Sequence, residues 1–72
     1  MNFASAFINL QRGHKIARST WKGYWHYDKE SGMIMIHTKE GVVLPLVETK
    51  DILYTLSACA CDDWNVVDDR EV

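Results

Sequence analysis

The sequence predicts a small α+β domain, because stretches with helical spacing occur near both ends of the chain and short strand-like runs lie between them. Phe3, Phe7 and Leu10 recur at the three- and four-residue intervals of an amphipathic helix. The middle of the chain instead breaks into short runs separated by turn-forming segments at residues 28–32 and 39–41. A chain of 72 residues has room for one domain, which we expect to span residues 1–72.

The first predicted element is a helix over residues 3–12. Asn2 precedes it and can cap its N-terminus, since an asparagine side chain accepts a hydrogen bond from a backbone N–H that has no partner in the helix. Gly13 follows the last helical residue and is the expected end of the helix, because glycine readily adopts the left-handed conformation found there.

Four strand-like runs follow, at residues 14–18, 24–27, 33–38 and 42–46. A bend around Trp21, which Gly23 permits, separates the first two runs. Short turns separate the others, and Gly41 in the second turn is free to take a positive φ. Three runs joined by two short turns predict an antiparallel β-meander.

A second helix is predicted over residues 50–59, with Thr49 as its N-cap. Its apolar stripe consists of Ile52, Leu53, Leu56 and Ala60. A short strand over residues 64–67 ends the domain, and residues 68–72 read as a frayed acidic tail.

Composition is ordinary for a globular protein, with 47% hydrophobic and 25% charged residues. The sequence contains no apolar run long enough to span a membrane and lacks the pattern of a signal peptide, so the cytoplasm is the expected compartment. Cys59 and Cys61 lie too close together for an unstrained disulfide and are expected as buried, reduced thiols. A core this small is marginal, and self-association is the expected supplement.

Charge is unevenly distributed along the chain. Residues 1–29 contain five cations and one anion, a balance of +4, whereas residues 30–72 contain three cations and nine anions, a balance of −6. This asymmetry indicates an anionic partner for the first half or pairing between subunits. Two halves that neutralise each other within one fold explain it equally well.

Neither catalysis nor metal binding is expected. The serines, cysteines and histidines fall into no local signature of a nucleophile with its base, so the chain is not expected to be an enzyme and has no candidate catalytic residue. A single C-x-C pair is a weak zinc signal, and residues two apart on a helix do not share a face. We therefore expect no metal and no cofactor.

Residues 13–25 are the candidate binding segment, with the sequence GHKIARSTWKGYW. Arg18 offers a planar fork that matches phosphate oxygens, and Lys22 adds positive charge nearby. Trp21 and Trp25 offer faces on which a base can stack. This mixture favours a ligand with phosphate and base. The alternative is that the tryptophans belong to the core and the lysines are simply solvated.

The chain resembles the small phage and prophage family known as DUF2829, the Thoeris anti-defence 2-like domain. The resemblance covers residues 2–67 and depends mainly on the N-terminal pattern L-x-x-G-x-x-(V/I)-A-R-x-x-W-x-G. The matching residues are Phe3, Leu10, Gly13, Ile16, Ala17, Arg18, Trp21 and Gly23, followed by Thr49, Asp51, Ile52 and Leu53 and then by Asp63, Trp64 and Val66. The chain departs from the family in a shorter excursion after the Trp-Gly bend and a longer gap from Asp51 to Trp64.

The resemblance implies an anti-defence function in the host cytoplasm. Similar members are homo-oligomeric sponges that bind immune signals, either cyclic nucleotides as in CBASS or cyclic ADP-ribose isomers as in Thoeris, without cleaving them. Carried onto this chain, Arg18 would hold phosphate, Trp21 or Trp25 would stack on a base, and Asp63 or Thr49 would contact polar edges. Others sharing the domain inhibit CRISPR effectors, so a protein-binding inhibitor of a host nuclease is the alternative. An accessory phage protein without a ligand is a third possibility.

Overall fold

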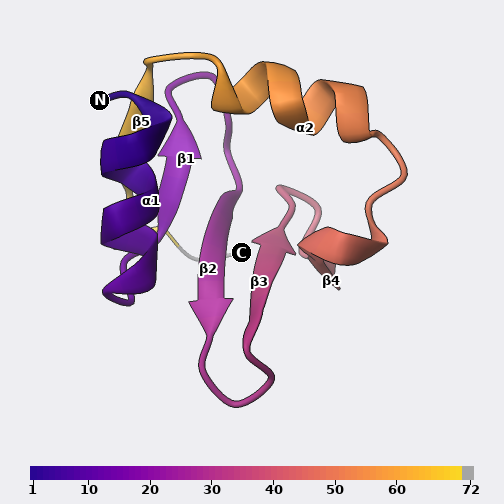
Figure 1. Ribbon diagram of the computed structural model, residues 1–72. Coiled ribbons are helices and arrows are strands. Elements are labelled where there is room, and N and C mark those ends of the chain that lie inside the picture. Colours follow the sequence, from indigo (N-terminus) through magenta and orange to yellow (C-terminus); the bar gives the residue numbers. More distant parts are fainter. Residues whose placement is uncertain (71–72) are drawn as a thin grey trace.

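The computed structural model describes residues 1–70 and contains two α-helices and one five-stranded antiparallel sheet (Figure 1). The elements in chain order are α1 (Phe3–Gln11), β1 (Ile16–Arg18), β2 (Tyr24–Asp28), β3 (Met33–His37), β4 (Val43–Pro45), the 3-10 helix η1 (Leu46–Glu48), α2 (Ile52–Cys59) and β5 (Trp64–Val66). The strands lie in the order β4-β3-β2-β1-β5. The predicted α+β architecture is therefore confirmed.

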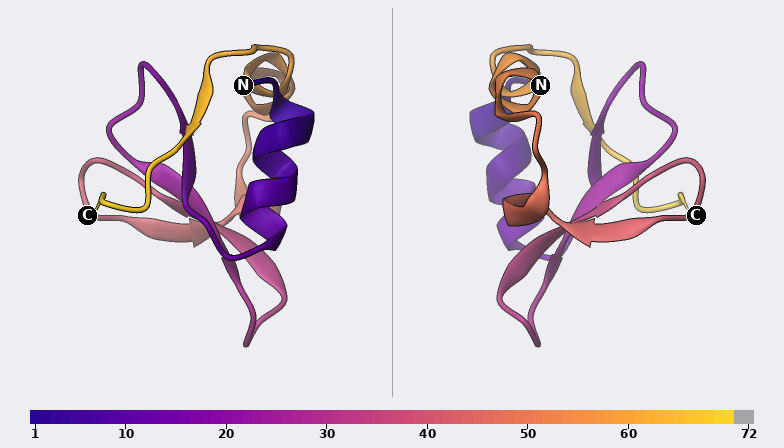
Figure 2. Two further views of the ribbon diagram at one scale, coloured as in Figure 1. Left: turned by 90° about the vertical axis from the view of Figure 1, so that its left-hand side faces the viewer. Right: turned by 90° about the vertical axis from the view of Figure 1, so that its right-hand side faces the viewer.

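Both helices lie on the same side of the sheet (Figure 2). α1 covers the part of the sheet formed by β1, β2 and β5, whereas α2 runs across one end of the strands (Figure 1). No helix among residues 1–70 is long and apolar enough to cross a membrane.

The ends of α1 are set by local interactions, as the sequence predicts. The Asn2 side chain accepts a hydrogen bond from the Ser5 N–H at 2.9 Å, which satisfies one of the free donors of the first turn. Gly13 has φ of +95°, in the left-handed region that glycine adopts without strain. The helix ends one residue earlier than predicted, with Arg12 as its C-cap.

The β2–β3 hairpin fixes which side chains face the helices. Trp25 pairs with Ile36 and faces α1, while Tyr24 pairs with His37 on the opposite face of the sheet. These pairs follow from the alternation of side chains along a strand. β4 is shorter than predicted, because Leu46 begins η1, which the sequence did not indicate.

Three tryptophans meet in the centre of the core. Trp64 is completely buried, and its ring centroid lies 5.1 Å from that of Trp21 and 5.2 Å from that of Trp25. The Trp64 indole N–H donates to the Ala58 carbonyl at 3.0 Å. This hydrogen bond joins α2 to β5 and satisfies a polar group that would be costly to bury alone.

α2 differs from the prediction in both its cap and its orientation. The N-cap is Asp51, which accepts from the Tyr54 N–H at 2.9 Å, so the prediction of Thr49 as the cap is wrong. The Thr49 hydroxyl instead donates to the Leu46 carbonyl and closes η1. The buried residue of the helix is Ala58, whereas the predicted apolar stripe faces away from the sheet.

The start of the C-terminal tail is held against the sheet rather than frayed as predicted. Asp68 accepts from the Lys15 N–H at 2.8 Å and lies 2.7 Å from His14 Nδ1. Arg70 donates from Nη1 to the carbonyls of Trp21 and Gly23. The rest of the predicted tail, residues 71–72, lies outside the described residues.

The His37 ring is expected to make the fold less stable in mild acid. His37 stacks on Tyr24 with ring centroids 4.4 Å apart, and burial, with the nearby charges of His26 and Lys15, lowers the pKa of His37 below 6.5. The unfolded chain therefore binds a proton at higher pH than the folded chain does. The contribution of His37 to stability is complete above pH 6.5 and is lost as the pH falls through the folded-state pKa.

The substitution His37→Phe keeps an aromatic ring on Tyr24 but cannot be protonated. Thermal unfolding of wild type and variant between pH 7.5 and 4.5 should show a wild-type midpoint that falls relative to that of the variant as the pH is lowered. A difference between the two midpoints that stays constant over this range would contradict the assignment.

Candidate functional site

Two hollows adjoin around Trp21 and form the candidate site. One, of about 320 Å³, lies between α2 and the strands β2 to β4; the other, of about 430 Å³, lies between residues 20–23 and 38–40. They share Trp21, Thr38 and Tyr54, and we call the combined feature the Trp21 groove. The first is also lined by Trp25, Ile36, Leu44, Thr49, Asp51 and Thr55, and the second by Thr20, Lys22, Gly23, Lys39 and Glu40.

Aromatic rings form one wall of the groove. The rings of Trp21 and Tyr54 lie with their centroids 6.4 Å apart and their planes 23° from parallel. The Trp21 indole N–H donates to the Tyr54 hydroxyl at 3.0 Å, which fixes the orientation of both rings. Trp25 lies behind Trp21, 4% exposed, and is part of the core. The groove therefore offers Trp21 and Tyr54, both partly exposed, as stacking surfaces.

Threonine and aspartate oxygens border the aromatic wall. The Thr55 and Thr49 hydroxyls donate to backbone carbonyls, so in this arrangement their oxygens act as acceptors toward a ligand. The Thr38 hydroxyl accepts from the Val42 N–H and retains its own hydrogen for donation. Asp51 has one carboxylate oxygen bonded to the Tyr54 N–H. A few convergent polar groups in an apolar hollow are typical of small-molecule sites.

The second hollow adds two cations. Lys22 and Lys39 are both exposed and both line it, together with Glu40. Both lysines line this hollow because residues 20–23 approach the end of β3: a side chain at Gly23 would collide with the His37 carbonyl oxygen. Among residues 1–70 neither lysine forms an ion pair with a carboxylate. Both ammonium groups are therefore available to an anionic ligand.

Arg18 and Asp63, predicted as separate ligand contacts, bind each other instead. The Arg18 Nε–H donates to Asp63 Oδ1 at 2.9 Å and Nη2–H donates to Oδ2 at 3.3 Å, with the Ser19 hydroxyl also donating to Oδ2. Hydrogen bonds from Arg18 lower the pKa of Asp63, and Asp63 raises that of Arg18. Neither residue lines the Trp21 groove. Their pairing anchors β1 to the start of β5.

This ion pair predicts a dependence of stability on acid. Because the folded-state pKa of Asp63 lies below 3.8, its ionised form stabilises the fold above that value, and the stabilisation is lost as the pH falls through the folded-state pKa. Asp63→Asn should lower the unfolding midpoint at pH 7 and bring variant and wild type closer together near pH 3. Thermal unfolding followed by circular dichroism measures both. Asp69→Asn, at another exposed aspartate, is the control and should leave the midpoint nearly unchanged.

The structure thus brings together four of the six predicted site residues. Trp21, Trp25 and Thr49 line the first hollow and Lys22 lines the second, whereas Arg18 and Asp63 lie outside both. Sequence reasoning missed Tyr54, Thr38 and Lys39. Tyr54 is the one residue whose sequence context offered a signal, as the sole aromatic residue in the second helical segment.

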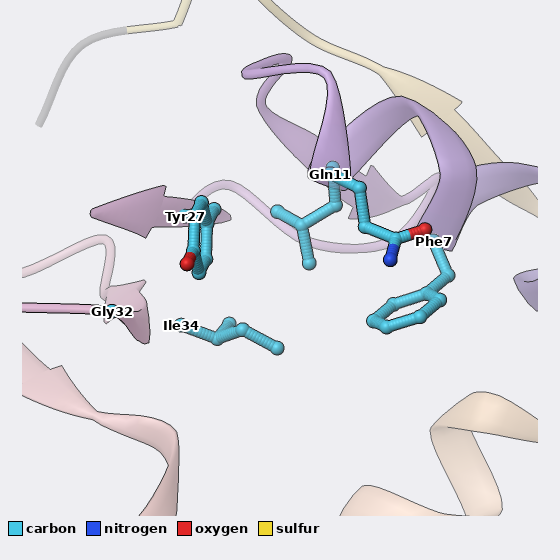
Figure 3. A pocket seen from close by; sticks show the side chains of 6 residues that line it. Phe7, Gln11, Tyr27, Gly32 and Ile34 are labelled. Atoms are coloured by element: carbon cyan, nitrogen blue, oxygen red, sulfur yellow. The ribbon is translucent and has the colours of Figure 1, made fainter. Parts of the chain in front are cut away.

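A further hollow of about 360 Å³ lies on the other side of the core, beside α1 (Figure 3). Its walls come from α1 and from the β2–β3 hairpin, and Figure 3 shows the rings of Phe7 and Tyr27 on either side of it. The lining residues are Phe7, Leu10, Gln11, Tyr27, Gly32 and Ile34, none of which is charged. An anionic ligand therefore has no charged partner there, and the Trp21 groove remains the stronger candidate.

The cysteines and histidines form no metal site within residues 1–70, where no three His, Cys, Asp or Glu side chains cluster. Cys59 and Cys61 are free thiols, and both are partly exposed rather than buried as predicted. Burial raises the pKa of Cys59 and so favours its uncharged thiol form, while Cys61 donates its S–H to the Ser57 carbonyl. The surroundings of Cys59 thus disfavour the thiolate, which is the nucleophilic form of cysteine.

Comparison with known proteins adds no relative: no model of a protein family matches the chain, and no curated protein matches it.

Proposed function

We propose that the chain is a non-catalytic binding protein that sequesters a nucleotide-type signal in the Trp21 groove. The signal would be a cyclic nucleotide or a cyclic ADP-ribose isomer, and the protein would act as a phage anti-defence sponge in the host cytoplasm. The family-like pattern of residues 3–23 supports this biological setting. The proposal also includes self-association of the chain into a homo-oligomer, a dimer or a tetramer.

The observation that carries the proposal is the adjacency of an aromatic hollow to a cationic one. Trp21 and Tyr54 belong to both hollows, and the second is also lined by Lys22, Lys39 and one acid, Glu40, so its charged groups are positive on balance. A nucleotide has the same arrangement, with an aromatic base at one end and phosphate at the other. Stacking and charge together are how proteins without base-specific contacts hold such ligands.

Each group of the groove has a role in this proposal. The base stacks on the exposed face of Trp21 or Tyr54, and the phosphates lie between the ammonium groups of Lys22 and Lys39. The ribose hydroxyls donate to Asp51 or to the threonine oxygens. Arg18 was predicted to bind the phosphate, but its guanidinium is occupied by Asp63. We therefore assign the phosphate contact to the two lysines.

Isothermal titration calorimetry against a panel of cyclic mono- and dinucleotides and cyclic ADP-ribose isomers tests the proposal. We expect binding of at least one member, recovery of that ligand unchanged after heating, and weaker binding at high salt because two charge contacts are screened. The variant Lys22→Gln/Lys39→Gln should bind more weakly and lose most of the salt dependence. Folded protein that binds no member of the panel would contradict the sponge function.

A protein-binding inhibitor of a host defence nuclease, such as a CRISPR effector, is the second candidate. Its support is the balance of −6 over residues 30–72, together with the exposure of Asp62, Asp68 and Asp69. Exposed carboxylates can occupy a basic cleft that otherwise holds nucleic-acid phosphates. Pull-down from host lysate separates the two candidates, because a stoichiometric protein partner supports inhibition and a small nucleotide released on heating supports sequestration.

A further inference from the structure

The outer side of α2 carries exposed apolar side chains that are not part of the groove. Ile52, Leu53 and Leu56 are 66%, 78% and 62% exposed, and Figure 1 shows no other element on this side of the helix. Val47 in the preceding η1 is 80% exposed. Large exposed apolar side chains gathered in one short segment, residues 47–56, are typical of an interaction site.

The geometry of the helix separates two faces. At about 100° per residue, Asp51, Thr55 and Ala58 lie on one side of α2, and these residues line the groove or are buried. Leu53 and Leu56 lie close to the opposite side by the same spacing. The more apolar face of the helix is therefore turned away from its own sheet, which reverses the usual arrangement of a surface helix.

The helix also lacks the charges that a solvent-facing helix normally carries. Ile52–Cys59 reads ILYTLSAC and contains no Asp, Glu, Lys or Arg. Depletion of charge at the centre of an apolar patch is the compositional signal of a protein interface. Charged residues occur just beyond both ends, with Lys50 before the helix and Asp62 after it, and both are exposed.

We infer that this face is the surface through which two copies of the chain associate, with their α2 helices packed antiparallel about a two-fold axis. A two-fold axis brings the same patch of each copy together, and an uncharged apolar patch is compatible with itself. The antiparallel arrangement places Lys50 of one copy near Asp62 of the other. Helix dipoles in this arrangement also attract each other rather than repel.

The flanking charges make a membrane surface a poorer occupant. Amphipathic helices that bind anionic lipid carry Lys or Arg on their polar side, whereas α2 is flanked by Glu48, Asp51 and Asp62 as well as by Lys50. In the antiparallel arrangement Lys50 of a second copy meets Asp62, whereas lipid phosphates would repel this carboxylate.

A stable dimer would need more surface than the helix alone offers. A typical stable interface removes about 800 Å² from each partner, which is about a sixth of the chain's 4799 Å² surface. An eight-residue helix is about 12 Å long, so the contact must also cover Val47 and the flanks at Lys50 and Asp62.

This inference rests on the self-association included in the proposed function and assigns it a surface. It also couples association to the groove, because the inner side of α2 supplies Asp51, Tyr54 and Thr55 to the groove wall. A second copy would hold that wall in place without contributing a ligand contact of its own.

Sedimentation velocity over a range of concentrations tests the inference. We expect wild type to associate, Leu53→Glu to raise the dissociation constant by about tenfold or more because it buries an unpaired charge, and Ile8→Glu to leave it unchanged. Ile8 is 49% exposed on α1 and is the matched control. Association of Leu53→Glu that equals that of wild type would overturn the assignment of this surface, as would a monomeric wild type.

Hydrogen exchange of the wild-type protein gives a test that no folding defect can affect. Amides of residues 52–59 should become more protected as the protein concentration rises, while those of α1 should not. Uniform changes in protection would contradict the inference.

A charge exchange tests the orientation of the two helices. Lys50→Glu should weaken association and Lys50→Glu/Asp62→Lys should restore it, whereas no restoration would contradict the antiparallel arrangement. Nucleotide titrations of Leu53→Glu are measured separately, so a failed interface and a failed ligand site give different results.

Discussion

Replacing Trp64 with alanine is expected to remove about 3–5 kcal/mol from the free energy of unfolding. Trp64 is completely buried and touches the rings of Phe3, Trp21 and Trp25, so its removal leaves a cavity bordered by α1, β2 and the segment that joins β1 to β2. A chain of 72 residues has a total stability of about 4–11 kcal/mol at the usual 0.05–0.15 kcal/mol per residue. The loss is therefore a large fraction of the total stability, and it unfolds the variant at 25 °C if the wild-type stability lies at the lower end of this range.

Urea unfolding followed by tryptophan fluorescence and circular dichroism measures this loss. Trp64→Phe should lose less, because it keeps most of the apolar volume but removes the indole N–H that donates to the Ala58 carbonyl. Val66→Ala, at a neighbouring position that is 37% exposed, is the control and should lose least. A Trp64→Ala variant as stable as Val66→Ala would show that the three tryptophans do not form the centre of the core.

Replacing Trp21 with leucine is expected to give the largest loss of ligand affinity. Stacking on an aromatic side chain contributes about 1–3 kcal/mol per base, which corresponds to about 5- to 150-fold in the dissociation constant. Leucine keeps an apolar contact with Trp25 and Trp64 but offers no flat face. Calorimetric titration with whichever nucleotide binds wild type measures the change.

Tyr27→Leu is the matched control for Trp21→Leu. Tyr27 is also a half-buried aromatic residue, but it lines the hollow beside α1 rather than the Trp21 groove. Circular dichroism must show both variants folded before affinities are compared. Equal affinities of Trp21→Leu and wild type would place the ligand elsewhere, and an equal loss in Tyr27→Leu would point to the stability of the fold instead of stacking.

Local signals in the sequence were enough to predict most of the fold. The Asn2 cap, the stop at Gly13 and the turn at Gly41 each depend on neighbouring residues, and each lies where the sequence indicates. The orientation of α2 could not be predicted in this way. An apolar stripe shows that a helix has two faces, but the contact between Ala58 and Trp64 decides which face turns toward the sheet.

The site was harder to predict than the fold because it depends on contacts between distant parts of the chain. Arg18 and Asp63 each suit a ligand by residue type, but β1 and β5 pair in the sheet and bring them together. Tyr54 and Lys39 come to Trp21 from α2 and from the β3–β4 turn. No spacing along the sequence encodes these approaches. The concentration of rings and cations in residues 13–25 is visible in the sequence, and Trp21 and Lys22 of that segment line the hollows.

Binding of a nucleotide-type ligand in the Trp21 groove is tested most directly by the indole N–H signals of the three tryptophans. In a heteronuclear NMR titration with the ligand panel, the Trp21 signal should shift, since its N–H group bonds to Tyr54 within the groove. The Trp64 signal should move least, since that N–H is buried against Ala58. Shifts confined to residues around Tyr27 and Phe7, or no shifts with any member of the panel, would contradict binding in this groove.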